Sequence, residues 1–177
     1  MKKYEFTGET KEIRLLFRTA TLHRIRATVA FGIVEVGDLG GWIEKEENLS
    51  HEGKAWVWGN AEVWGNAEVW GNAEVWGNAK VCGDAKVCGD AKVFSASHVL
   101  VIGAIGSRND FTTFYRDKDN EITVKCGCFL GKIDRFLEKV TQTHGDSKYA
   151  LVYRAAVEVA KLQIDLSGEA PKDADEE

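Results

Sequence analysis

The residues best suited to bind a small ligand lie between positions 106 and 116. Gly106 lets a ligand approach the backbone, serine and threonine offer hydroxyl groups, and arginine offers a planar set of donors for phosphate or carboxylate. We therefore predict an anion-binding pocket lined by Ser107, Arg108, Thr112, Thr113 and Arg116. The same residues also suit an ordinary polar turn, and the sequence leaves both interpretations open.

The charge of the chain makes such a local cluster necessary if an anion binds. The formal net charge of the 177 residues is −5, which repels anionic ligands in general. It also argues against duplex nucleic acid as a partner, because phosphate binding normally requires a basic field. We therefore expect a small anionic ligand or a protein partner, and neither duplex nucleic acid nor a membrane.

Other catalytic or metal-binding chemistry is not indicated. Cys126 and Cys128 lack the two-residue spacing of a zinc knuckle, and we expect all four cysteines to be free thiols. We predict no catalytic residue, metal or cofactor. Met1-Lys2-Lys3-Tyr4 shows no signal-peptide pattern, and no apolar run approaches about 18 residues, so we expect a soluble, cytoplasmic protein.

An internal repeat must position any such site. From Ala55 the sequence repeats Ala-x-Val-[Trp/Cys/Phe]-Gly-[Asn/Asp], and the alternation predicts short strands with Ala and Val facing inward. Gly-Asn and Gly-Asp suit corners, because both residues tolerate positive φ. Three six-residue sides would close a triangular parallel β-helix, which we place at residues 37–102.

Two patterns follow if one turn of this β-helix has about 18 residues, as three six-residue sides require. Each acidic x position then stacks beneath a lysine, which gives the pairs Glu62–Lys80, Glu68–Lys86 and Glu74–Lys92. One face also gathers aromatic residues, namely Trp56, Trp58, Trp76 and Phe94. An exposed aromatic face of this size implies a buried contact, either with other subunits or with the ends of the same chain.

The repeat resembles the hexapeptide-repeat left-handed β-helix proteins, the trimeric acyltransferase-like superfamily. It is most similar to a "GNAxVxG" subgroup of enteric bacteria and prophages, as are residues 37–44 (GDLGGWIE), 47–50 (ENLS) and 21–27 (TLHRIRA). The resemblance implies a left-handed twist, a homotrimer and a phage or prophage origin. The chain departs from the acyltransferase pattern by placing Trp or Cys after the valine and no histidine inside the regular repeats, which argues against that activity.

The two ends differ from the repeats. Residues 1–36 contain strand-like runs at 4–6 and 22–31, which we interpret as an N-terminal β cap. Residues 103–166 predict an α+β module, with a β-hairpin (111–116 and 122–129) and helices at 132–144 and 146–164. The acidic segment 167–177 predicts a disordered tail. The predicted fold class is therefore mainly β.

Three functions remain open. The first is a non-enzymatic trimeric scaffold whose C-terminal module binds a small anionic, nucleotide-like ligand or a host protein, with a role against host defence in the host cytoplasm. The second is an acyl- or nucleotidyl-transferase, which needs a general base, usually histidine; His98 ends the repeats and His51 occupies an inward position, so neither is well placed. The third is a purely structural rod.

Overall fold

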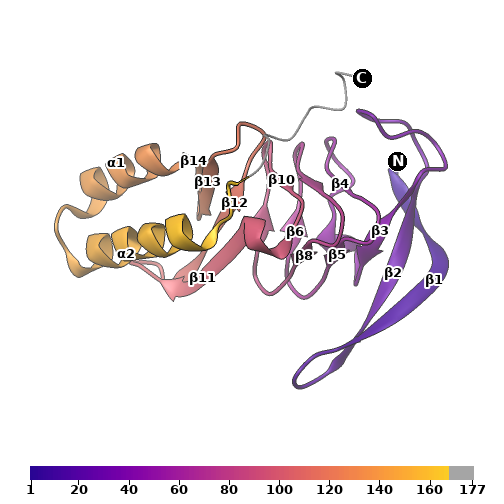
Figure 1. The fold of residues 1–177 in the computed structure, drawn as a ribbon, viewed down its shortest axis with the longest axis horizontal. Helices are drawn as coiled ribbons and strands as arrows, with labels where there is room; N and C mark the ends of the chain where they lie inside the picture. Colours follow the sequence, from indigo (N-terminus) through magenta and orange to yellow (C-terminus); the bar gives the residue numbers. More distant parts are fainter. Residues whose placement is uncertain (168–177) are drawn as a thin grey trace.

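The chain forms an elongated molecule with three parts (Figure 1). A long hairpin lies at one end, the repeats form the middle, and a sheet with two helices forms the other end. The structure is a computed structural model that describes residues 1–167. The predicted disordered tail, 167–177, lies outside the described residues except for Ser167.

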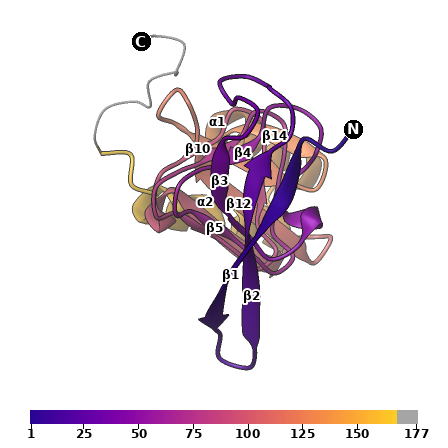
Figure 2. The same cartoon turned by 90° about the vertical axis from the view of Figure 1, so that its right-hand side faces the viewer.

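The N-terminal part is a hairpin that joins the sheet of the repeats. Strands β1 (Tyr4–Arg14) and β2 (Thr19–Ala27) pair antiparallel, and β2 also pairs antiparallel with β3 (Leu39–Ile43). The tip of the hairpin projects away from the body of the molecule (Figure 2). The two strand-like runs are confirmed, but both strands reach further toward the tip than the sequence pattern indicated.

The repeats form very short strands that pair in parallel. Within the described residues the Ala-x-Val units give seven two-residue strands: β4 (Trp56–Val57), β5 (Glu62–Val63), β6 (Glu68–Val69), β7 (Glu74–Val75), β8 (Lys80–Val81), β9 (Lys86–Val87) and β10 (Lys92–Val93). The pairs are β4–β7–β10, β5–β8 and β6–β9, with β5 also paired to β3. Partners in adjacent repeats are 18 residues apart, as the sequence predicted.

The interior of the repeats is dry and made of small residues. The prediction that seven valines point into one core is confirmed, because each is at most 1% exposed; they are Val57, Val63, Val69, Val75, Val81, Val87 and Val93. The alanines that alternate with them are equally buried. The corner glycines take positive φ, for example +71° at Gly65, where a Cβ would lie 3.3 Å from the backbone of Gly83, 18 residues further along the chain.

The fold class predicted from the sequence is nevertheless wrong, because the structure does not show a left-handed parallel β-helix. The strands belong to four small sheets, and none of them forms a solenoid within residues 1–167. The largest sheet, β1-β2-β3-β5-β8, is mixed, since the hairpin joins it antiparallel. Purely parallel pairing is confined to one three-stranded and one two-stranded sheet. The physical reason is that a Gly-Asn or Gly-Asp turn follows each of the two-residue strands β4–β9, so the repeats form only short stretches of parallel pairing.

The C-terminal part is a four-stranded antiparallel sheet with two helices. The strands are β11 (Val99–Ile105), β12 (Asp110–Arg116), β13 (Ile122–Cys126) and β14 (Phe129–Lys132), paired in that order. Helices α1 (Ile133–His144) and α2 (Lys148–Gln163) pack on one face of this sheet around a second core. The prediction of two helices is confirmed. The predicted hairpin is present as β12 and β13, but it is part of a larger sheet. Residues 99–105, interpreted as the end of the repeats and a turn, form strand β11, and residues 129–132 form the separate strand β14.

Strand β12 covers the end of the repeats with the sheet face that lies opposite the helices. The Thr113 hydroxyl accepts the backbone N–H of Lys86 at 3.0 Å, and the Tyr115 hydroxyl donates to the Cys88 carbonyl at 2.8 Å. The last repeat would otherwise present unpaired backbone groups at an open edge. Two 3₁₀ turns are also present: η1 (Glu46–Asn48) lies between β3 and β4, and η2 (Ala96–His98) lies between β10 and β11.

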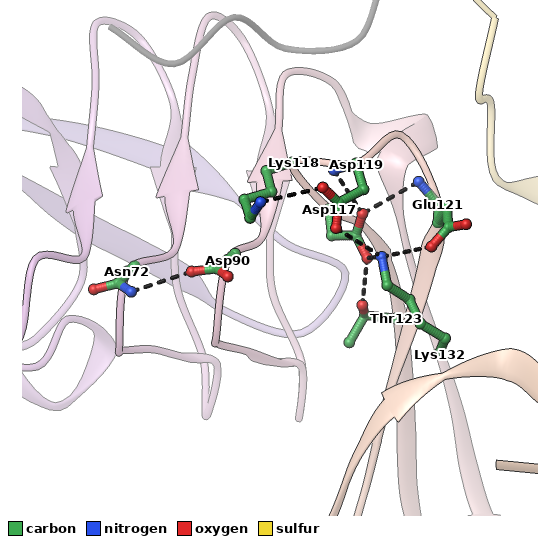
Figure 3. Close-up of polar contacts among 8 residues, drawn as sticks. All are labelled: Asn72, Asp90, Asp117, Lys118, Asp119, Glu121, Thr123 and Lys132. Atoms are coloured by element: carbon green, nitrogen blue, oxygen red, sulfur yellow. Dashed lines mark hydrogen bonds and ion pairs between the residues drawn. The ribbon is translucent and has the colours of Figure 1, made fainter. Parts of the chain in front are cut away.

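Asp117 fixes the loop after β12, as Figure 3 shows. Its carboxylate accepts the backbone N–H of Asp119 at 3.0 Å, the Thr123 hydroxyl at 2.5 Å and the Lys132 ammonium at 2.5 Å. The neighbouring backbone N–H of Lys118 donates to the Asp90 carbonyl of the last repeat at 3.0 Å. The buried carboxylate therefore fixes the β12–β13 loop, the Lys118 N–H ties that loop to the repeats, and the bonds of the carboxylate leave it little capacity for a ligand.

The predicted charge pairs stack as expected, but they differ in burial. Glu62, Glu68 and Glu74 pair in register with Lys80, Lys86 and Lys92. Glu68 and Lys86 are exposed, whereas Lys92 is buried and its ammonium lies 2.7 Å from the Glu74 carboxylate. A pair in solvent contributes little, and a buried pair leaves an uncompensated charge when one partner is removed.

We expect Glu68→Lys to lower the free energy of unfolding by less than about 1 kcal/mol, because it places two exposed lysines side by side. The double variant Glu68→Lys/Lys86→Glu should recover most of the loss. Glu74→Lys should cost clearly more, since it confronts the buried Lys92 ammonium. Urea unfolding measures all three, and an equal loss for Glu68→Lys and Glu74→Lys would contradict the difference in burial.

A second prediction concerns Lys3, whose ammonium donates to the Ala55 carbonyl at 2.7 Å. Burial lowers the pKa of Lys3 to about 8 from an ordinary 10.5. Below pH 8 the side chain is charged in both states. Between pH 8 and 10.5 the unfolded chain binds more protons than the folded chain, so stability rises with pH.

The stability of the native chain relative to Lys3→Met should therefore increase by about 1–2 kcal/mol between about pH 7 and about pH 9.5. Comparing the two proteins removes the opposing contribution of Tyr4 and Tyr115, whose pKa values are raised by burial. Unfolding curves at both pH values give the difference, and a difference that does not change with pH would show that Lys3 is not buried as a charge.

Candidate functional site

A pocket of about 400 Å³ lies in the C-terminal part, between the β11–β12 and β13–β14 turns and the two helices. Its floor is apolar, with Phe129, Phe136 and Val140. Its rim carries polar and charged side chains: Ser107, Arg108, Asp110, Cys126, Cys128, Lys139, Thr143, His144 and Tyr153. A pocket of this size, with an apolar floor and convergent polar groups, is a common form of small-molecule site.

The β11–β12 turn holds its shape because Tyr153 packs directly on Gly106. Gly106 has φ +73°, and a Cβ there would lie 2.0 Å from the Tyr153 hydroxyl. Tyr153 comes from α2 and meets Phe136 of α1 edge-on, with ring centroids 5.6 Å apart. The glycine therefore allows the turn and the helices to close on one another at the pocket.

Arg108 is the main cation of the pocket. Its guanidinium group lies against Gly127 of the β13–β14 turn, where a Cβ would be 2.6 Å from Arg108 Nη1. Lys139 of α1 lines the same pocket. The carboxylate of Asp110 opposes these charges, but one of its oxygens accepts the backbone N–H of Phe111 at 2.7 Å. The rim therefore places two cations against one partly engaged anion.

Two thiols and a phenol line the inner side of the pocket. Cys126 and Cys128 flank Gly127, and the Thr112 hydroxyl donates to the Cys126 sulfur at 3.3 Å. Burial raises the pKa of Tyr153, the Cys126 thiol adds to the rise, and Ser107 opposes it. Tyr153 is therefore a neutral hydrogen-bonding group at neutral pH.

The structure separates the five residues that the sequence placed in one pocket. Ser107 and Arg108 line it, and Thr112 lies behind Cys126. Thr113 faces the repeats instead, because neighbouring residues of β12 point to opposite faces. Arg116 is buried at the other end of the strand, with Nη1 3.4 Å from the His98 ring. The strand alternation could have separated Thr112 from Thr113, but not Arg116 from the pocket.

The helices supply the residues that sequence reasoning missed. Lys139, Thr143 and His144 come from the last turns of α1, and Tyr153 from α2. Polar residues on an amphipathic helix normally face solvent, so no local signal marks them as parts of a site. Only the return of the helices onto the sheet brings them to Arg108.

The aromatic face predicted as an interface divides into a buried part and a partly exposed part. Trp56 is 0% exposed and packs against Phe31 and Tyr4 of its own chain, with ring centroids 5.4 Å and 6.2 Å away. The rings of Trp58 and Trp76 stack at 4.4 Å, and those of Trp76 and Phe94 at 6.1 Å. Phe94 remains 38% exposed. Contact with the chain's own N-terminal part thus accounts for Trp56, and the subunit interface and the trimer stay predictions.

No protein-family model matches the chain, and no curated protein is similar to it in sequence at a significant level. The resemblance to hexapeptide-repeat proteins is therefore still a prediction. Neither helix is long and apolar enough to cross a membrane among the residues that the structure describes. The described part also contains no group of three or more His, Cys, Asp or Glu side chains arranged to hold a metal ion.

The contact between Gly106 and Tyr153 can be tested with Gly106→Ala and Gly83→Ala. Both glycines have positive φ, +73° and +66°, so both variants carry the left-handed strain of about 1 kcal/mol. Only Gly106→Ala adds a clash, because a Cβ at Gly83 meets nothing within 4 Å. We expect Gly106→Ala to lose about 1–3 kcal/mol more in urea unfolding. Equal losses would mean that Tyr153 does not rest on this turn.

Proposed function

We propose that the C-terminal part is a binding module for a small phosphate-bearing ligand with a flat apolar group, such as a nucleotide. The observation that carries this proposal is the position of Arg108 and Lys139 above the floor formed by Phe129 and Phe136, in one pocket of about 400 Å³. Pockets that hold small ligands commonly have volumes of about 300–1,000 Å³.

The rim suits a phosphate group. A guanidinium group offers paired N–H donors to phosphate oxygens, and a lysine adds a mobile point charge. The hydroxyls of Ser107 and Thr143 supply neutral donors at the same rim. In a chain of net charge −5, this local excess of cations is what an anionic ligand requires.

The floor suits the rest of a nucleotide. Phe129 and Phe136 meet at a centroid distance of 5.3 Å, and Val140 continues the apolar surface. A flat ring gains from contact with aromatic side chains while its phosphate stays at the charged rim. The repeats then serve as a rigid support that holds β12, and through it the pocket, in place.

Arg108→Ala should weaken the binding of adenosine 5′-monophosphate by about 10- to 100-fold, because a charge-assisted contact is worth about 1.5–3 kcal/mol. Arg135→Ala is the matched control, since Arg135 is exposed on α1 and does not line the pocket. Adenosine, without phosphate, should bind the native chain at least as weakly as the nucleotide binds Arg108→Ala, because it also loses the contact with Lys139. Calorimetry measures each affinity, beside a thermal melt of each variant.

Equal affinity of the native chain for adenosine and its monophosphate would contradict the proposal. A melt lowered by Arg108→Ala, with no nucleotide binding to the native chain, would instead assign Arg108 to the structure of the turn. The bound nucleotide should be recovered unchanged, and its chemical conversion would favour a transferase over a binding module.

A further inference from the structure

Strand β11 is an open edge of the C-terminal sheet. It pairs with β12 on one side, and no other strand of residues 1–167 pairs with its second side. Its sequence, VLVIGAI, contains neither a charged residue nor a proline, the residues that normally keep an edge strand from pairing with another chain. The strand lies along the lower margin of the C-terminal part in Figure 1. It therefore offers unpaired backbone groups on an apolar strand.

Helix α2 is apolar on two sides. Its inner side packs into the second core, with Tyr153 and Val157 among the buried residues. Its outer side carries a stripe of apolar residues that are exposed: Leu151, Val152, Ala155, Val159 and Leu162. The spacing of three and four residues from position 152 to position 162 keeps the stripe on one side of the helix. A helix that is apolar on both sides is normally covered on both.

The stripe lies on the side of α2 that adjoins the open edge of β11. Helix α2 packs against β11, and α1 packs against β13 and β14. Arg154 marks the side of α2 that faces α1, because its guanidinium group donates to the Thr141 hydroxyl at 3.2 Å and to the Gly145 carbonyl at 3.1 Å. At 3.6 residues per turn, Val152 and Val159 lie about 140–160° around the helix from Arg154. These valines therefore point away from α1, toward the free side of β11.

The charges favour a second copy of the chain at this surface. Two copies of net charge −5 repel one another over most of their surface, but β11 and the stripe carry no acidic residue. The acidic residue of α2, Glu158, lies on the side of Arg154 and pairs with Lys161 at 3.0 Å. If two α2 helices run antiparallel, Lys148 at the start of one lies beside the carbonyl end of the other, where a cation is favourable.

We propose that β11 and the outer stripe of α2 form a two-fold interface with a second copy of this chain. The two β11 strands pair antiparallel and join the two C-terminal sheets, and the α2 stripes pack side by side next to this junction. A two-fold axis brings the same patch of each copy together, so each open edge and each stripe covers its equivalent. The interface uses neither the aromatic face of the repeats nor the residues that line the pocket of Arg108.

Val159→Lys tests the interface in the full chain, because it places a charge inside the stripe at a residue that is exposed in one copy. By sedimentation equilibrium the native chain should have an even multiple of the 19.6 kDa mass of one chain, and Val159→Lys should halve that mass. The dissociation constant should rise at least about 100-fold, since two unpaired ammonium groups would be buried. Val152→Lys should act in the same way.

Gln142→Lys is the matched control, because it adds the same charge at an exposed position on α1 and should leave the mass unchanged. Hydrogen exchange tests the pairing of β11 separately. In an antiparallel pair, alternate residues of a strand face its neighbour, so β12 protects only every second amide of residues 99–102. All of these amides should be protected in the native assembly, and alternate ones should exchange rapidly in Val159→Lys.

The proposal is overturned if the native chain is a monomer at about 100 micromolar, a concentration at which a specific dimer is populated. It is equally overturned if folded Val159→Lys and Val152→Lys keep the native mass, as a trimer built only on the aromatic face would. Identical exchange of the β11 amides in the native chain and in Val159→Lys would exclude the strand pairing. None of these results bears on nucleotide binding, since the stripe and β11 do not line that pocket.

Discussion

The rest of the structure depends on the dry interior of the repeats, where alanine and valine from every unit pack together while the backbone of each unit bonds to the unit 18 residues away. Small inward side chains let successive units approach to strand spacing. The glycine turns lead the chain from one short strand to the next without adding bulk, as at Gly65, which lies against Gly83. This interior gives a rigid middle on which both ends of the molecule are built.

Such an interior is open at both ends, and the two ends are closed differently. The hairpin β1–β2 continues the sheet through β3, whereas β12 lies across the last repeat and bonds to Lys86 and Cys88 through side chains. Because strand residues alternate, the face of β12 that does not close the repeats carries Thr112 and Phe114 toward the helices. The C-terminal pocket thus exists because the strand that closes the repeats has a second face to cover.

Some charged residues pair within the chain, and others line two cavities. Most charged residues of the repeats pair with each other along the stack, as Glu74 does with Lys92, and Asp117 binds its own loop and Lys132. In a chain of net charge −5, Arg108 and Lys139 line the C-terminal pocket, and Lys54 lines a smaller cavity beside the aromatic face. Their placement beside aromatic surfaces distinguishes the two cavities from the ordinary solvated surface.

The sequence by itself determined the local rules: the inward valines, the 18-residue register, the glycine corners and the two helices, because each depends on a short repeating pattern of side-chain size and polarity. It did not determine that the β1–β2 hairpin adds antiparallel strands to the largest sheet, because this pairing joins segments outside the repeat, and the expected parallel β-helix was wrong. Only the tertiary structure decided the candidate sites. Arg108 lines one pocket with Lys139, His144 and Tyr153 because the two helices return onto the sheet. Arg116, at the end of β12, instead lies beside His98. Proximity between distant segments is a property of packing, which residue type and spacing along one segment cannot encode.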